Sequence, residues 1–120
     1  MVVDNDRDMC RVISDVLKQA GIKVNIAYDG ESALAKVKKQ PYDLMLLDYK
    51  LPGISGLTVL EKTRQVRPNL KTIMISAFGD DSTRTRAKEL GAYAFLDKPF
   101  NIEGLVKVVR KALNRKGGIG

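Results

Sequence analysis

The sequence predicts a single α/β domain in which a parallel sheet is covered by helices on both faces. Short apolar runs alternate with amphipathic stretches five times along the 120 residues, and this βα repeat is typical of a doubly wound sheet. The length fits one domain, because domains cluster at roughly 100–150 residues. Hydrophobic residues make up 44% and charged residues 29% of the chain, which excludes collagen-like, low-complexity and wholly disordered classes.

The first predicted unit is a very short strand followed by a helix. The strand has only Val2 and Val3 before Asp4, so we expect the chain to have lost residues upstream. Apolar residues then recur at helical spacing over residues 8–20, and Gly21 ends this helix.

The next two predicted strands differ in burial. Apolar and polar residues alternate over 22–26, which predicts an edge strand with one solvent-facing side. A helix then begins at Asp29 and ends at Pro41, because proline lacks the backbone donor that a helix interior needs. The run 44–47 is apolar without alternation, as expected of a central strand buried on both faces, and Asp48 stands at its carboxyl end.

The fourth unit contains a weakly apolar helix. A loop with proline and glycine covers 52–56, and the helix after it stops before Pro68. The fourth strand, 72–75, is followed by Ser76. The next helix, 81–90, is nearly all polar, so we expect packing to hold it weakly and regard it as a candidate moving part.

The last unit closes the domain. A short strand is predicted over 94–96, and the final helix is capped by Asn101 and carries apolar residues at helical spacing up to Leu113. We therefore expect one domain over residues 1–115 and a flexible tail over 116–120.

The composition excludes several functions. The chain contains no histidine, which rules out Ser-His-Asp and Cys-His catalysis, HExxH metal sites and a phosphohistidine donor within the chain. The single cysteine, Cys10, has no partner for a disulfide or a zinc site, and its expected role is packing. No apolar run approaches the ~20 residues that span a bilayer, and no signal peptide follows Met1. We therefore expect a soluble, cytoplasmic protein with no membrane partner.

The net charge raises a nucleic-acid hypothesis. Twenty-one Lys and Arg against fourteen Asp and Glu give +7, and affinity for polyanions begins with such an excess. The basic residues, however, are spread along the chain and fall mostly near predicted helix ends, where they complement helix dipoles. Solvated helix faces are therefore preferred over direct nucleic-acid binding.

Polar side chains collect where the predicted strands end. The first strand ends in Asp4-Asn5-Asp6, the third in Asp48 and the fourth in Ser76, and Lys98 lies just beyond the fifth. In an open parallel sheet, ligands bind outside the carboxyl ends of the strands. Any one of these residues alone could be a turn residue, but their conjunction at matching strand ends indicates a functional site.

The residue types at these ends suggest phosphoryl chemistry. Carboxylates gathered without a nearby histidine repel one another unless a hard cation shares them, and oxygen ligands of this kind suit Mg²⁺. A carboxylate such as Asp48 can act as a covalent nucleophile toward phosphorus. Lys98 and the Ser76 hydroxyl would supply positive charge and a hydrogen-bond donor to phosphoryl oxygens.

Four motifs occur in order along nearly the whole chain: Val2-Val3-Asp4-Asn5-Asp6, Leu46-Leu47-Asp48-Tyr49-Lys50-Leu51-Pro52-Gly53-Ile54-Ser55-Gly56, Met74-Ile75-Ser76-Ala77 and Lys98-Pro99-Phe100. Together they resemble the receiver domain of two-component response regulators. The resemblance implies a flavodoxin-like (βα)5 fold with strand order 2-1-3-4-5.

The resemblance also implies roles for individual residues. Asp48 would be the phosphoacceptor, and Lys98 would contact the phosphoryl group. Mg²⁺ would be bound by Asp4, Asn5, Asp48 and the backbone carbonyl of Lys50. The family usually has two adjacent acids after the first strand, and here Asn5 stands at the position that normally binds the metal directly. An amide oxygen can still coordinate Mg²⁺, but one negative charge is missing.

Further features of the family concern switching and docking. Ser76 would be the switch hydroxyl and Phe95 the aromatic switch residue, and the Lys98–Pro99 peptide bond would be cis. Asp6 is expected to point into the following loop. The partner would be a sensor histidine kinase or a phosphotransferase protein, and the chain a monomer or a weak, phosphorylation-dependent dimer. The surface expected to face the partner consists of Met9, Cys10, Val12, Pro99 and Phe100.

Three functions remain in competition. Within the family, the segments 48–53, 77–79 and 88–92 look most similar to single-domain sporulation phosphorelay intermediates of the sporulation initiation phosphotransferase F type. Such a protein assists its own phosphorylation without being a turnover enzyme. The alternative is an N-terminal receiver cut from a DNA-binding transcriptional response regulator. A flavin-binding protein of the same fold is disfavoured, because the chain has no tryptophan and only Asp-rich loops at the expected site.

Overall fold

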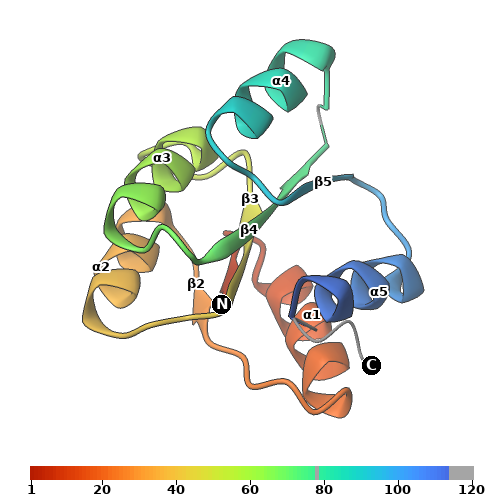
Figure 1. Ribbon diagram of the computed structural model, residues 1–120. Coiled ribbons are helices and arrows are strands. Elements are labelled where there is room, and N and C mark those ends of the chain that lie inside the picture. The colour runs from red at the N-terminus through yellow and green to blue at the C-terminus, as the bar shows by residue number, and fades with distance from the viewer. Residues whose placement is uncertain (78, 114–120) are drawn as a thin grey trace.

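Five parallel strands form one sheet in the order β2-β1-β3-β4-β5 (Figure 1). The structure is a computed structural model that describes residues 1–77 and 79–113. The strands are β1 (Val2–Val3), β2 (Ile26–Ala27), β3 (Leu44–Asp48), β4 (Lys71–Ser76) and β5 (Ala94–Asp97). The helices are α1 (Arg7–Gln19), α2 (Gly30–Lys39), α3 (Gly56–Val66), α4 (Asp81–Glu89) and α5 (Ile102–Leu113). The predicted fold class and strand order are confirmed.

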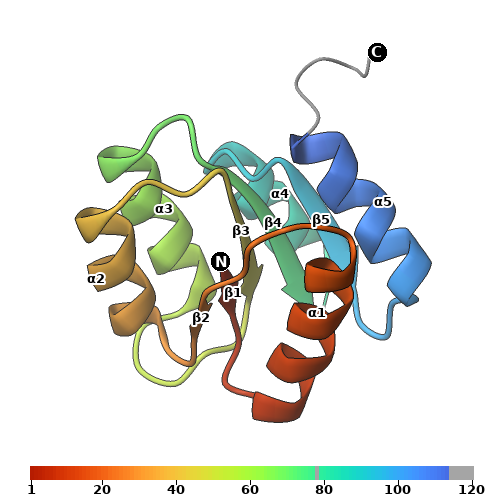
Figure 2. The same ribbon diagram turned by 90° about the horizontal axis from the view of Figure 1, so that it is seen from below.

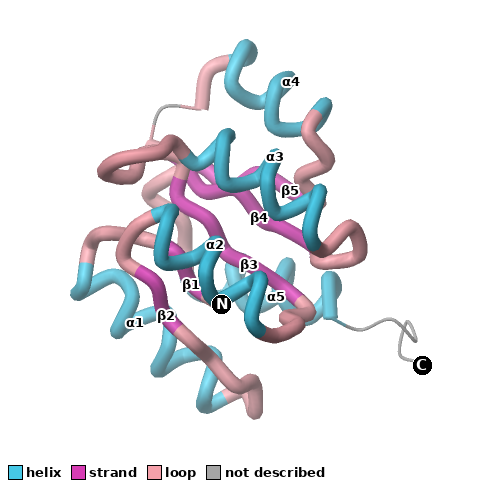
Figure 3. Tube along the Cα trace, turned by 90° about the vertical axis from the view of Figure 1, so that its left-hand side faces the viewer, coloured by secondary structure: helices cyan, strands magenta, loops and turns pink. Residues whose placement is uncertain are grey.

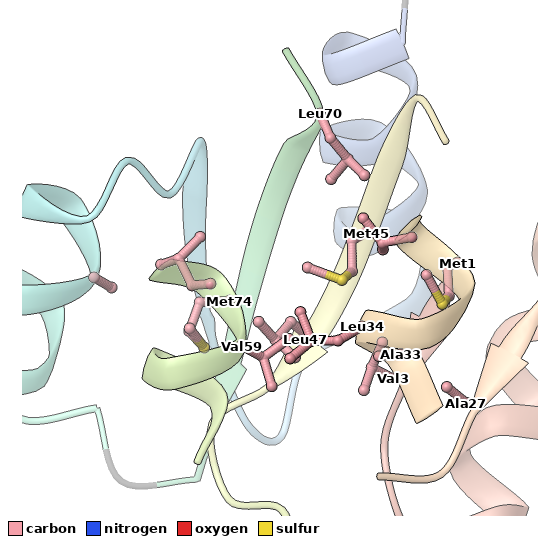
Figure 4. Packing of buried hydrophobic residues seen from close by; sticks show 13 residues of the cluster. Met1, Val3, Ala27, Ala33, Leu34, Met45, Leu47, Val59, Leu70 and Met74 are labelled. Carbon is pink, nitrogen blue, oxygen red and sulfur yellow. The ribbon is translucent and has the colours of Figure 1, made fainter. Parts of the chain in front are cut away.

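Helices cover both faces of the sheet. Figure 2 shows α1 and α5 together on one face, and Figure 3 shows α2, α3 and α4 in a row on the other, with α4 at the end of the row. Each face has its own apolar core. On the α2–α3–α4 face the core includes Val3, Met45, Leu47 and Met74 from the strands (Figure 4).

Strand β3 is buried along its whole length, as its unbroken apolar run predicts. Leu44 and Leu46 contribute to the core under α1 and α5, whereas Met45 and Leu47 contribute to the opposite core. This alternation anchors the strand on both sides, so the position of Asp48 at its end is fixed by the surrounding core.

The second strand is shorter than predicted. Alternation suggested a strand over 22–26, but only Ile26 and Ala27 are in β2, at the edge of the sheet. The reason lies in its partner: β2 pairs only with the two residues of β1, Val2 with Ile26 and Val3 with Ala27. The edge position itself is confirmed.

Helix ends follow the sequence signals. Asp6, Asp29, Ser55 and Asp80 cap α1, α2, α3 and α4 through their side chains, and the Asn101 carboxamide accepts a hydrogen bond from the Gly104 backbone N–H at 2.5 Å. Every helix carries Lys or Arg in its last turn, which confirms the expected placement of basic residues near helix ends.

Helix α4 is the least anchored of these helices. Its buried residues are Thr83 and Ala87, and Leu90 just beyond it is half-buried. This agrees with its polar sequence. The predicted tail over 116–120 lies outside the described residues. Within the described part of the chain, no helix has the length and apolar character that a membrane crossing requires.

Two residues of helix α3 offer a matched test of how this helix packs on the sheet. Leu60 is fully buried and Val66, on the same helix, is 38% exposed. We expect Leu60→Ala to lower the free energy of unfolding by ~3 kcal/mol, because a buried leucine loses both its transfer energy and its packing. Val66→Ala should change it by less than ~0.5 kcal/mol. Urea denaturation followed by circular dichroism measures both, and equal effects would contradict the assignment of this face.

Candidate functional site

Two buried carboxylates meet at the carboxyl edge of the sheet and share one lysine. Asp4 follows β1 and Asp48 ends β3, which are neighbouring strands, and the two residues are only 4% and 6% exposed. The Lys98 ammonium lies 3.3 Å from Asp4 Oδ2 and 3.5 Å from Asp48 Oδ1. The sheet thus brings together three of the residues that the sequence predicted for the site.

Backbone contacts hold Lys98 in this position. It follows β5 directly, and its backbone N–H donates to the Ser76 carbonyl oxygen at 2.8 Å. The Lys98–Pro99 peptide bond is cis, as expected. The lysine therefore leaves the sheet beside the end of β4, with its ammonium directed at the two carboxylates.

The loop after β1 separates two acids with different surroundings. Asp4 Oδ1 accepts from the Asp6 backbone N–H at 2.9 Å, which orients the Asp4 carboxylate. Asp6 is exposed and accepts from the Met9 backbone N–H at 3.1 Å as the cap of α1. The expectation that Asp6 points into a following loop is wrong, because α1 begins at the next residue and the Asp6 side chain caps it. Asn5, between the two acids, is exposed.

The surroundings of Asp48 destabilise the ionised form of its carboxyl group. Burial raises the pKa of its carboxyl from 3.8 to about 6, and the charge of Asp4 adds to this effect, whereas Lys98 lowers the pKa. Burial disfavours any ionised acid, and a like charge nearby does the same. The carboxylate is therefore ionised at neutral pH but less well stabilised than an exposed one.

The loop after Asp48 folds back onto the strand end. Tyr49 N–H donates to the Ile75 carbonyl at 2.8 Å, and Gly56 N–H donates to the Tyr49 carbonyl at 2.9 Å. A Cβ at Gly56 would lie 2.5 Å from the Asp48 carbonyl oxygen, so only glycine permits this approach. The loop between them carries Lys50, two residues after Asp48.

Ser76 and Phe95 lie on the adjacent strands β4 and β5. Ser76 ends β4 and is 1% exposed. Phe95 is in β5, where it pairs with Met74, and its half-buried ring packs against the core under α2, α3 and α4. The structure thus places both predicted switch residues near the carboxyl edge.

The donors at this edge are oxygens, which suits a hard cation. Among the described residues, no group of three or more His, Cys, Asp or Glu could hold a metal ion. The carboxylates of Asp4 and Asp48 would therefore need neutral oxygens to complete a coordination shell, and the Asn5 amide and the Lys50 carbonyl are the ones that the sequence predicted. Two buried acids that share one lysine leave one negative charge uncompensated, so the site fits Mg²⁺.

Most of the predicted partner surface forms one groove next to the site. Its lining includes Met9, Val12, Pro99 and Phe100, together with Lys98. Val12, at 47% exposed, is open to solvent in this groove.

Two residues of this region differ from expectation. The prediction that Cys10 lies on the partner surface is wrong, because the residue is fully buried. Its thiol donates to the Asp4 carbonyl at 3.2 Å. Burial raises the pKa of its thiol to about 11, and its predicted packing role is confirmed. Ile102 also lines the groove and is 36% exposed. The predicted partner surface did not include Ile102.

Comparisons with known proteins point to a single family. The model of the response regulator receiver domain matches residues 1–110. The transcriptional regulatory protein CpxR of Klebsiella pneumoniae is 37% identical over 115 residues, which cover 96% of this chain and 49% of that protein. The transcriptional regulatory protein ZraR of Salmonella typhimurium is 31% identical, with 94% of this chain and 26% of that protein covered. The chain thus spans between about a quarter and a half of these relatives.

Solved structures agree with this comparison. A CheY-like response regulator receiver domain protein from Methanospirillum hungatei superposes with a TM-score of 0.93 at 29% identity, covering 99% of this chain and 95% of the other. The receiver domain of NtrX from Brucella abortus gives a TM-score of 0.88 at 34% identity, covering 95% and 97%.

The raised pKa of Asp48 predicts a stability that depends on pH. The folded pKa of about 6 exceeds the ordinary 3.8, so the folded state binds the proton more tightly, and stability is lost as pH rises through 6. Asp48→Asn removes this ionisation. We expect it to raise the free energy of unfolding at pH 7.5 by ~1–3 kcal/mol.

Urea denaturation in EDTA, at several pH values from 5 to 7.5, measures this effect. The gain from Asp48→Asn should grow as the pH rises. Asp15→Asn removes an exposed carboxylate from α1 and should show no such trend. A stability difference for Asp48→Asn that is negative or independent of pH would contradict the account.

Proposed function

We propose that this chain, which belongs to the response regulator receiver domain family, accepts a phosphoryl group on Asp48 from the phosphohistidine of a partner protein. The observation that carries the proposal is the buried Asp48 carboxylate with the Lys98 ammonium at 3.5 Å. The chain has no histidine, so the donor imidazole belongs to the partner.

The transfer step requires an ionised nucleophile and compensated charge. An Asp48 oxygen attacks phosphorus in line, the new O–P bond forms as the P–N bond breaks, and the electron pair stays on the donor imidazole. Lys98 lies close enough to Asp48 that its ammonium can contact the phosphoryl oxygens, which carry the negative charge after transfer. The buried Ser76 hydroxyl, at the end of the adjacent strand, donates a hydrogen bond to one of them.

Asp4, Asp48, the Asn5 amide and the Lys50 carbonyl would hold Mg²⁺. The ion, when bound, supplies positive charge that offsets the repulsion between the carboxylates and the incoming phosphoryl group. Asp4 is oriented for this role by the hydrogen bond from the Asp6 backbone N–H.

Phosphorylation then biases a switch. A phosphoryl group on Asp48 attracts the Ser76 hydroxyl, and Phe95 on the neighbouring strand moves toward the space that Ser76 leaves. Helix α4, with only Thr83 and Ala87 buried, is the element that repacks at least cost.

The kinase or phosphotransferase partner docks in the groove lined by Met9, Val12, Pro99 and Phe100. The groove shares Lys98 with the phosphorylation site, so a helix seated there would present its histidine to Asp48. Val12 and Ile102 are both exposed and line this groove, and exposed apolar side chains gathered in one place are typical of a docking surface.

A second proposal concerns the output of residues 1–115. The relatives described above are named transcriptional regulatory proteins, and this chain matches only a part of each. This favours a receiver that controls a transcriptional regulator, in which phosphorylation-dependent pairing of receivers transmits the signal and the receiver itself does not contact nucleic acid. The sporulation phosphorelay function has no comparable support among these relatives.

Phosphorylation of Asp48 is tested by intact mass. Incubation with acetyl phosphate and Mg²⁺ should add about 80 Da, one phosphoryl group, to the wild type. Asp48→Asn should add none, because the nucleophile is gone. Lys98→Ala should fold but lose most of the adduct, since a charge-assisted contact is removed. A full adduct on Asp48→Asn would refute the assignment of the acceptor.

The amide of Asn5, in place of a second acid, predicts weak binding of Mg²⁺. We expect Asn5→Asp to bind Mg²⁺ ~10-fold more tightly than the wild type, because affinity follows the charge of the ligands. The same substitution at exposed Asn69, before the amino end of β4, controls for net charge. Calorimetric titration of the three proteins decides, and equal affinities of wild type and Asn5→Asp would show that the amide is no handicap.

A further inference from the structure

Arg84 of α4 contacts three residues in two other parts of the molecule, beside the proposed switch. Its Nε donates to the Gly79 carbonyl at 3.1 Å, and its Nη2 forms an ion pair with Asp97 Oδ2. The guanidinium carbon lies 4.7 Å from the centroid of the Phe95 ring. One side chain therefore links the loop after β4, helix α4 and strand β5.

The loop backbone is packed closely against this cluster. A Cβ at Gly79 would overlap the Asp97 carboxylate and would lie 3.1 Å from the Phe95 ring and 3.2 Å from Arg84 Nη2. A side chain at this position would therefore displace the Asp97 carboxylate first and press on Phe95 and Arg84. Gly79 lies three residues after Ser76 in the sequence, so Arg84 also holds the backbone just before α4.

These contacts matter because α4 has few others. Its buried side chains are small, Thr83 and Ala87, so burial contributes little to its attachment. Figure 1 shows α4 at the edge of the molecule, joined to the strands through the loops at its two ends. Arg84 supplies a polar attachment to the carboxyl end of β5 where apolar packing is scarce.

We propose that Arg84 is a positioning residue that holds Phe95 in its resting place. The proposal rests on the proposed function insofar as it treats Phe95 as the moving residue. The guanidinium stacks on the ring, and the ion pair with Asp97 fixes the guanidinium two residues further along the same strand. Phe95 can move toward Ser76 only if the ring leaves Arg84 or if α4 moves with it. Arg84 thereby sets how readily the domain leaves its resting state.

Arginine is suited to this role in a way that lysine is not. Its planar guanidinium can stack on a ring while its nitrogens bond a carboxylate and a carbonyl. Arg84→Lys keeps the charge but loses the planar group and the second donor nitrogen, so it should restore only part of the effect. Arg86, on the same helix, faces Glu89 at 3.5 Å and serves as the matched control.

The experiment compares the wild type, Arg84→Ala, Arg84→Lys and Arg86→Ala. Each protein is labelled with ¹³C-phenylalanine, and the ring signals of Phe95 are assigned by comparison with Phe95→Leu. In the unphosphorylated state we expect the Phe95 signals of Arg84→Ala to move and to average between environments, with Arg84→Lys intermediate and Arg86→Ala unchanged. With acetyl phosphate and Mg²⁺, Arg84→Ala should be phosphorylated roughly fivefold faster than the wild type, as expected for the loss of one cation–π contact and one ion pair.

A purely structural brace would give a different result. Amide hydrogen exchange over residues 80–89 would then accelerate in Arg84→Ala while the Phe95 signals stayed at their wild-type positions, and this would overturn the proposal. If intact mass shows no adduct on the wild type, the proposed phosphoacceptor function fails. The ring signals of the unphosphorylated proteins then still decide whether Arg84 positions Phe95.

Discussion

The candidate site depends on one lysine that two buried carboxylates share. Asp4 and Asp48 would repel each other at the edge of the sheet, and the Lys98 ammonium, within 3.5 Å of both, offsets this repulsion only in part. Burial first, and the charge of Asp4 second, therefore keep the pKa of Asp48 raised although Lys98 lowers it. A site in this condition favours a ligand that brings positive charge to the carboxylates, and a bound cation would then also offset the charge of an incoming phosphoryl group.

The sheet makes this arrangement possible, and the helices determine its consequences. Parallel strands end at one edge, so residues 4, 48 and 98 converge although they are far apart in the sequence. The strands carrying the acids are fixed by apolar cores on both faces. Helix α4 has little such packing and is attached through Arg84. The same molecule therefore has a rigid site and a loosely held neighbour that can respond to it.

Local patterns predicted the rigid part well. Apolar runs, glycine and proline stops and polar residues at strand ends were sufficient to place Asp48, Ser76 and Lys98 together. What failed depended on partners remote in sequence. The second strand is short because its partner β1 is short, and Cys10 is buried because its side of α1 packs into the core formed with β3, β4 and α5. The cluster of Arg84, Phe95 and Asp97 joins two elements that no local periodicity relates.

The most direct test of this account is the pKa of Asp48 itself, measured from the ¹³Cγ chemical shift of its side chain in metal-free protein. The wild type should titrate near pH 6 rather than near 3.8. In Lys98→Met the pKa should rise further, because the offsetting ammonium is gone. A wild-type pKa near 3.8, or one that does not change in Lys98→Met, would contradict the claim that the shared lysine governs the site.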